Sequence, residues 1–209
     1  MILVSLIKKI FLLIFLFFAA SQISHSAQFL PSAFQVKFEQ SYQSVTGATK
    51  KSEGLLDYQF PGKIRIKEFK NNTIYISNGK KTWYYTPPII ETEKGSVQVS
   101  STKPVMSKLF DTLQRGLKTN EVFQVKNLTP DQTQLEFNQS ASKEFNLTKV
   151  SIHWKGATIR TLEKVRSLDL NYLDGKKVTL SFTEIKKEMK YSQKHFEFNI
   201  PKNTQIIQN

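Results

Sequence analysis

The chain contains no cysteine among its 209 residues. This absence excludes disulfides, a thiol nucleophile, a cysteine-based metal site and a lipid attached to an N-terminal cysteine. Histidine is scarce, and its three copies show no H-x-x-H or H-E-x-x-H spacing, so the usual zinc-ligand pattern is missing. Glycine totals only 8, and neither a glycine-rich phosphate loop nor a G-x-S-x-G elbow is present. We therefore expect no metal, no cofactor and no enzyme activity.

Long apolar runs are also absent, except at the N-terminus. Lys8 and Lys9 precede the apolar run Ile10–Ala20, and small residues follow it. This order is typical of a secretory signal, and the run is short for a bilayer span, which needs about 20 residues. The pattern predicts a cleaved signal peptide over residues 1–27 and one mature domain over residues 28–209. An uncleaved membrane anchor is the alternative.

Acidic residues are outnumbered by basic ones. Lys and Arg total 30 and Asp and Glu total 17, so the formal net charge is +13. The signal segment takes two lysines with it and leaves about +11. Such a charge attracts anionic surfaces, and for a secreted protein these are phospholipid or lipopolysaccharide and not nucleic acid. Because the lysines are scattered along the chain, general solubility is the alternative explanation.

Short β-type runs separated by turn dipeptides fill most of the mature chain. Many short strands with one inserted helix predict an antiparallel barrel or a strongly curved sheet. The segment Gln28–Ser44 fits either a short helix or a first strand, because its aromatic residues match both periods. The other predicted strands are Gly54–Phe60, Ile64–Ile66, the two halves of Asn72–Pro88, Val122–Leu128, Gln134–Phe137, Phe145–Trp154, Thr158–Val165, Ser167–Leu173, Lys177–Ile185 and Phe196–Ile200.

The strongest hairpin signal is Asn78–Gly79. Both residue types tolerate the positive φ that a type I′ turn requires. Strand alternation then places Ile74 and Ile76 on one face and Tyr75 on the other. The hairpin therefore predicts two antiparallel strands joined at this turn.

One helix is predicted over Lys103–Leu117. Pro104 suits its first turn, Thr102 is the chemically better N-cap, and Gly116 marks its end. Its apolar positions share one face: Val105, Met106, Leu109, Phe110, Leu113 and Leu117. Such a stripe packs on a sheet as ordinary core, or it covers an opening in a barrel as a lid. Both interpretations are compatible with the pattern.

Three segments resemble one family. They are P-G-K-I-R-I (Pro61–Ile66), I-S-N-G-K-K-T-W-Y-Y-T-P (Ile76–Pro87) and F-E-F-N-I-P-K-N-T-Q-I-I (Phe196–Ile207). In order and spacing they resemble the periplasmic outer-membrane lipoprotein carrier family, LolA. The resemblance implies a mainly β fold with a few α-helices, a half-open, incomplete antiparallel β-barrel with a helical lid. It also implies a monomeric periplasmic chaperone that carries acylated lipoproteins from an inner-membrane releasing transporter to an outer-membrane receptor.

The resemblance also implies a lipid-binding cavity. Ile64 matches a cavity-facing position of the proline-led strand, and Tyr75 matches an apolar cavity position before the hairpin turn. The residues expected at the cavity are Leu55, Phe60, Ile64, Ile66, Tyr75, Trp83, Tyr85, Val105, Met106, Leu109, Phe110, Leu113 and Phe137. We expect Ile64→Glu to leave folding intact and to weaken acyl-chain capture, because a charge in an apolar cavity is costly.

Two features depart from the family pattern. The family has an arginine immediately before the strand proline, where it latches the lid by hydrogen bonds, but this chain has Phe60. Lid locking is then apolar, uses another residue such as Arg65, or is absent. The family also has a full helix before the first strand, whereas few residues separate the predicted cleavage site from Phe34. These departures concern lid movement more than the fold.

Two other functions are compatible with the sequence. A divergent relative could bind or sense an envelope lipid or glycolipid without transferring lipoproteins. A hydrolase would depend on His153 or His195, although a single strand histidine such as His153 more commonly has a structural role. Transfer to a membrane and turnover are the observations that separate these functions.

Overall fold

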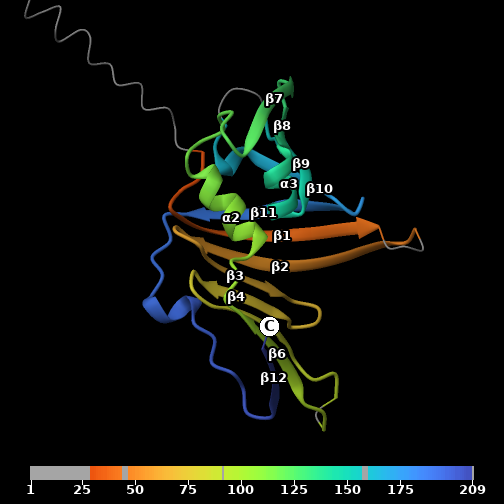
Figure 1. The fold of residues 1–209 in the computed structure, drawn as a ribbon, viewed down its shortest axis with the longest axis vertical. Coiled ribbons are helices and arrows are strands. Elements are labelled where there is room, and N and C mark those ends of the chain that lie inside the picture. The colour runs from red at the N-terminus through yellow and green to blue at the C-terminus, as the bar shows by residue number, and fades with distance from the viewer. Residues whose placement is uncertain (1–28, 44–46, 91, 157–159, 209) are drawn as a thin grey trace, which may run out of the picture.

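The computed structural model describes residues 29–43, 47–90, 92–156 and 160–208 (Figure 1). The predicted signal peptide lies outside these residues. The described residues form one 12-stranded sheet and two α-helices. The elements are β1 Ala33–Gln43, β2 Thr49–Gln59, β3 Lys63–Glu68, β4 Ile74–Asn78, β5 Thr82–Thr86, β6 Gly95–Ser100, α2 Val105–Leu113, β7 Phe123–Thr129, β8 Gln132–Phe137, α3 Gln139–Phe145, β9 Leu147–Trp154, β10 Val165–Tyr172, β11 Lys177–Lys187 and β12 Thr204–Gln208, with short 3-10 turns at Leu162–Lys164 and Gln193–Phe196.

The sheet is open. Its strand order is β12-β6-β5-β4-β3-β2-β1-β11-β10-β9-β8-β7, and the two end strands β12 and β7 do not pair in the described structure. All neighbours are antiparallel except β12, which pairs with β6 in parallel. Figure 1 shows α2 lying across one face of the sheet in front of β1 and β2. The predicted mainly β, half-open architecture with helices on one side is confirmed.

The face of the sheet under α2, called the inner face here, carries the main core. Cross-strand register places Phe34 of β1 opposite Tyr58 of β2, and Tyr58 opposite Ile64 of β3. Phe110 of α2 packs on this row, with its ring centroid 5.4 Å from that of Phe34 and 5.2 Å from that of Tyr58. Because these side chains alternate with polar ones along each strand, the inner face is apolar over most of the sheet.

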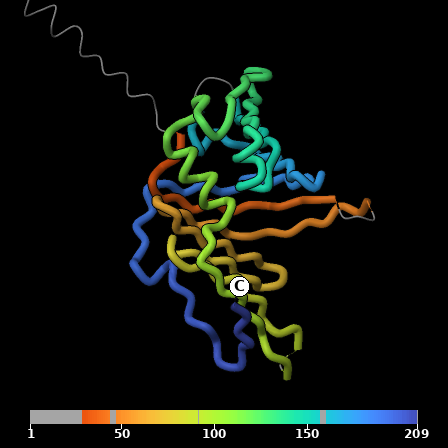
Figure 2. The backbone as a smooth tube through the Cα atoms, in the orientation of Figure 1, coloured from red at the N-terminus to blue at the C-terminus, as the bar shows by residue number. Residues whose placement is uncertain are grey.

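The opposite, outer face is covered in part by the chain's C-terminal segment, residues 189–203. Ile76 and Val97 lie on the outer face of β4 and β6 and are buried. The ring of Phe198 lies 5.3 Å from that of Tyr85 on β5, and the 3-10 turn Gln193–Phe196 contacts β3 and β4. Figure 2 shows this segment running along the sheet from β11 to β12. It therefore shields apolar side chains that the strands would otherwise expose.

The lid helix is shorter than predicted. It spans Val105–Leu113, and Pro104 occupies the N-cap position without a side-chain cap hydrogen bond, so Thr102 is not the cap. Gly116 has a φ of +95° just beyond the helix, which confirms its place at the end.

The Asn78–Gly79 turn also differs from the prediction. Only Gly79 has a positive φ, so the turn is not type I′. Asn78 remains in β4, and its Oδ1 accepts hydrogen bonds from the Lys80 and Lys81 amides at 3.0 and 2.9 Å. The asparagine side chain therefore organises a longer loop, and the predicted faces of β4 are retained.

Other differences lie in the C-terminal half. Residues 139–145 form α3, so the predicted strand begins at Leu147 and not at Phe145. The Asn138 side chain caps α3 by accepting from the Ala141 amide at 2.8 Å, and Asn146 ends it at a φ of 53°. Both caps are readable in the sequence, and the short length of the helix hid its period.

Two predicted strands are wrong. In Thr158–Val165, the described residues 162–164 form a 3-10 turn, while residues 158 and 159 lie outside the described structure. In Phe196–Ile200, no strand forms, and the last strand is β12 further along the chain. The ambiguous N-terminal segment is strand β1.

Candidate functional site

An apolar cavity lies on the inner face beyond the N-terminal end of α2. It has a volume of about 130 Å³, and we call it the chamber. Strands β1, β2, β3, β10 and β11 and the first turn of α2 contribute its walls. The lining residues are Phe38, Gln40, Leu56, Ile66, Met106, Leu170, Tyr172, Lys176, Val178, Leu180 and Phe182.

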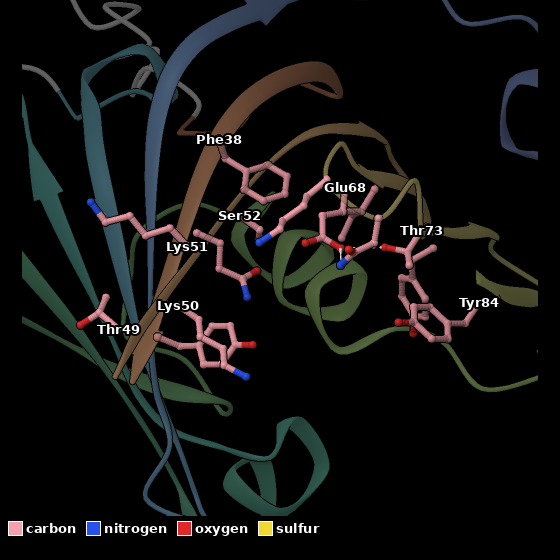
Figure 3. A pocket seen from close by; sticks show the side chains of 14 residues that line it. Phe38, Thr49, Lys50, Lys51, Ser52, Glu68, Thr73 and Tyr84 are labelled. Carbon is pink, nitrogen blue, oxygen red and sulfur yellow. Dashed lines mark hydrogen bonds between the residues drawn. The ribbon is translucent and has the colours of Figure 1, made fainter. Parts of the chain in front are cut away.

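A larger, more polar hollow adjoins the chamber. This vestibule has a volume of about 710 Å³ and shares Phe38, Gln40 and Ile66 with the chamber as lining residues. Figure 3 shows Phe38 and Glu68 above it, with Tyr84 on one side and Lys50 on the other. The two hollows together change from apolar to polar along the inner face.

Gly54 decides where Phe38 lies. A Cβ atom at Gly54 would come within 2.6 Å of both the Phe38 ring and the Lys67 carbonyl oxygen. Real Cβ atoms do not approach that closely, so only glycine at position 54 leaves room for the Phe38 ring against β2. Phe38 therefore forms a shared wall between the chamber and the vestibule.

A polar latch holds α2 against the turn between β2 and β3. Asp111 Oδ1 accepts hydrogen bonds from the Tyr58 hydroxyl at 2.7 Å and from the Gly62 amide at 2.8 Å. Ser107 Oγ donates to the Gly62 carbonyl at 2.9 Å. These contacts involve the same turn that carries Phe60. The helix supplies the carboxylate of Asp111 and the hydroxyl donor of Ser107, and β2 and the turn supply the two donors to that carboxylate.

Tyr58, a hydroxyl donor of the latch, has a raised pKa. Burial raises the pKa of Tyr58 well above its usual range, and the hydrogen bond to the Asp111 carboxylate and its charge raise it further. Tyr58 therefore remains a protonated donor. Burial likewise raises the pKa of Tyr75 at the vestibule. Both phenols are therefore neutral, Tyr58 in the core under α2 and Tyr75 at the vestibule.

The structure brings some of the predicted cavity residues to the two hollows. Ile66 lines both, Met106 lines the chamber, and Tyr75 lines the vestibule. The core under α2 takes four others, which are Ile64, Leu109, Phe110 and Leu113. Because Ile64 is fully buried there, a glutamate would disrupt the core itself, and Ile66 is the better position for a cavity test.

The remaining predicted residues lie elsewhere. Leu55 is on the outer face, opposite Lys37 and Lys67 in the register, and its neighbour Leu56 lines the chamber. Trp83 and Tyr85 are also on the outer face, opposite Ile76 and Ile74. Strand alternation separates these residues from the inner face, since each one-residue step changes sides.

Three predicted residues line neither hollow. Phe60 is 47% exposed at the β2–β3 turn, and Val105 is half-buried against the core. Phe137 packs between Phe123 and Phe145, with ring centroids 5.9 and 5.4 Å away. That group lies where α3 meets β8, at the other end of the sheet from β3.

Sequence reasoning missed most of the chamber's far wall. Leu170, Tyr172, Val178, Leu180 and Phe182 come from β10 and β11. Their regular alternation was a usable signal for one sheet face. What the alternation could not show is that β11 pairs with β1, which brings this wall next to β2 and β3.

Arg65 and the two described histidines lie on the outer face. Arg65 pairs with Asp57 in the register, so it does not reach α2. His153 Nε2 lies 2.7 Å from Asp169, and His195 Nε2 lies 2.9 Å from Asp57. Each histidine is thus paired with a carboxylate within the fold, outside both hollows.

The described residues contain no group of three or more His, Cys, Asp or Glu side chains arranged to hold a metal ion. No helix among them is both long enough and apolar enough to span a bilayer.

The sequence of this chain matches a family model over most of its length. Residues 31–199 match the model for "Outer membrane lipoprotein carrier protein LolA". The chain belongs to this family. The match includes β1–β6, α2, α3 and β7–β11, so both hollows of this LolA-family protein lie within it.

The chain also resembles solved structures, at low sequence identity. A LolA superfamily protein from Nitrosomonas europaea is 10% identical, with a TM-score of 0.47, over 80% of this chain and 91% of that one. An uncharacterized conserved protein from Thermus thermophilus is 9% identical, with a TM-score of 0.46, over 86% of this chain and 91% of that one. No curated protein sequence matches significantly. The family assignment therefore rests on the sequence match.

Proposed function

We propose that this LolA-family protein is a non-enzymatic periplasmic carrier that buries the acyl chains of lipoproteins and moves them from the inner to the outer membrane. The observation that carries the proposal is an apolar chamber on the inner face of a sheet that matches the lipoprotein carrier model. By the same family relation, its partners are acylated lipoproteins, an inner-membrane releasing transporter and an outer-membrane receptor.

The chamber is small in this state. Its volume of about 130 Å³ is below the roughly 300–1,000 Å³ of ordinary ligand pockets. Lipoprotein acyl chains need more room, and displacement of α2 from Tyr58 and Gly62 would provide it. The structure described here is then a closed form, in which the lid covers apolar side chains that cargo would contact once the lid has opened.

The energetics suit a carrier. Each buried CH₂ group contributes about 0.8 kcal/mol, so even part of one acyl chain offsets the cost of opening a latch made of three hydrogen bonds, each worth about 1–3 kcal/mol. The net affinity that remains is moderate. Moderate affinity lets a receptor with a better acyl site remove the cargo.

The test is capture followed by transfer. Mature protein is mixed with a fluorescent triacylated lipopeptide, and the complex is separated by gel filtration. We expect a soluble one-to-one complex, which then delivers the lipopeptide to membranes that carry the receptor. A folded protein that forms no complex would overturn acyl-chain burial.

Retention without transfer would instead support an envelope lipid-binding protein. Hydrolysis of the lipopeptide that is lost on His153→Ala or His195→Ala would support a hydrolase. Neither result is expected, because each histidine is bound to a carboxylate on the outer face.

A further inference from the structure

Cationic side chains from three separate segments surround the hollows. Lys50 and Lys51 of β2 and Lys70 of the β3–β4 connection line the vestibule, and Lys176 of the β10–β11 turn lines the chamber. Lys176 Nζ lies 5.1 Å from the ring centroid of Tyr42 and 5.9 Å from that of Tyr172. These cation–π contacts hold the ammonium group at the edge of the apolar chamber.

The positive charge around the hollows is not neutralised within the described structure. Lys50, Lys51, Lys70 and Lys176 form no ion pair with any residue that it describes, whereas Lys126 on the outer face pairs with Glu136.

One carboxylate lines the vestibule. Glu68 Oε2 accepts hydrogen bonds from Thr73 Oγ1 at 3.0 Å and from Asn71 Nδ2 at 3.2 Å. Its charge is thus directed to neutral groups of the β3–β4 connection and not to a lysine. Four lysines against one carboxylate leave the hollows with a positive potential.

The apolar and cationic parts are in the order that an amphiphile requires. Leu56, Leu180 and Phe182 line only the chamber, and Lys50 and Lys70 line only the vestibule. Given the acyl-chain burial of the proposed function, we infer that the cavity selects an amphiphile whose acyl chain adjoins an anionic head group, a phosphate or a carboxylate. The chain enters the chamber, and the head group stays among the lysines.

The test compares two lipids with the same chain. Palmitoyl lysophosphatidylglycerol and palmitoyl lysophosphatidylcholine are titrated into the mature protein by calorimetry, below their micelle concentrations and at low salt. The anionic lipid should bind about tenfold more tightly, because exposed charge pairs contribute roughly two- to fivefold each. The ratio should fall toward one at 1 M salt, where the screening length is about 3 Å.

Two further ligands separate the sources of the anion. Palmitate, with a carboxylate head group, should share the preference, while inorganic phosphate alone should not bind measurably, because it has no chain for the chamber. Binding of phosphate without a chain would overturn the inference and identify a plain anion site.

The matched variants have the same charge change on opposite faces. The triple variant Lys50→Gln, Lys70→Gln, Lys176→Gln leaves only Lys51 at the hollows, so it should lose most of the preference for the anionic lipid and retain binding of lysophosphatidylcholine. The control triple changes three outer-face lysines, which are Lys37, Lys67 and Lys149, and should retain the preference.

The outcomes distinguish the two proposals. Equal affinity of the unaltered protein for both lipids would overturn the head-group inference and leave acyl-chain burial in place. Binding of neither lipid by folded protein would overturn acyl-chain burial as well. Equal loss in both triple variants would show that only net charge matters and would also overturn the inference.

Discussion

Replacing Asp111 with alanine removes the acceptor that holds α2 on the sheet. Its Oδ1 atom accepts from the Tyr58 hydroxyl at 2.7 Å and the Gly62 amide at 2.8 Å. Hydrogen bonds to charged groups contribute about 1.5–3 kcal/mol each, and a buried donor left unpaired costs about 1–3 kcal/mol. Because the Asp111 side chain is 20% exposed and water can enter, we expect a loss near the lower end, about 3 kcal/mol in all.

The assay has a global and a local readout. Urea unfolding measures the free energy of unfolding, and native-state hydrogen exchange follows the Gly62 amide. Asp111→Asn retains an acceptor oxygen and should lose only about 1 kcal/mol. Glu144→Ala breaks the exposed α3–α2 pair with Lys108 and should change stability by less than about 0.5 kcal/mol.

The latch should also affect capture. A protein that must open before it binds has its affinity reduced by the fraction of open form. Asp111→Ala should therefore take up the triacylated lipopeptide faster and more tightly than the unaltered protein. An unfolding free energy within about 0.5 kcal/mol of the original, together with unchanged Gly62 exchange, would refute the latch, since such a change is ordinary for a surface substitution.

Ile66→Glu should weaken lipopeptide binding at least about tenfold, because it removes contacts with two or more CH₂ groups; Leu55→Glu, between two lysines on the outer face, should bind normally, and equal loss in both would contradict the cavity assignment. His195→Ala should lower the urea unfolding free energy by about 2 kcal/mol, because it takes a donor from buried Asp57; an unchanged value would mean that this contact does not hold the C-terminal segment. The pKa of Tyr58 is raised in the folded protein. The contribution of Tyr58 to the free energy of unfolding is therefore fully present below the unfolded pKa of about 10. Above that pH it falls by about 1.4 kcal/mol per pH unit. Tyr58→Phe should make that alkaline slope shallower, and an identical slope would show that Tyr58 ionises in the folded state.

Local patterns predicted much of the fold. Strand alternation correctly placed Ile74 and Ile76 on one face of the sheet and Tyr75 on the other. The helical period correctly placed Leu109, Phe110 and Leu113 on the buried side of α2. These features depend on neighbours a few residues apart, so a single sequence contains them.

The sequence analysis missed two elements, one because it is short and the other because its contacts are with residues far away in the chain. Helix α3 is only seven residues long, which is too few to show a helical period. The C-terminal segment shows neither a helical nor a strand period. Its course is set instead by contacts of Phe196 and Phe198 with strands β3–β5, which lie more than 100 residues earlier in the chain.

By itself, the sequence determined the class of the protein: many short antiparallel strands, one amphipathic lid, no cysteine chemistry, and the three segments of the LolA pattern. Only the tertiary structure decided the site. The pairing of β1 with β11 closes the chamber, strand alternation puts Leu56 and not Leu55 in its wall, and Asp111 meets Gly62 across 49 residues. It also brings Lys50 and Lys70 to the vestibule and Lys176 to the adjoining chamber. The physical reason is that a local pattern fixes which side of a strand a residue faces, while its partner across the cavity depends on which distant strands hydrogen-bond.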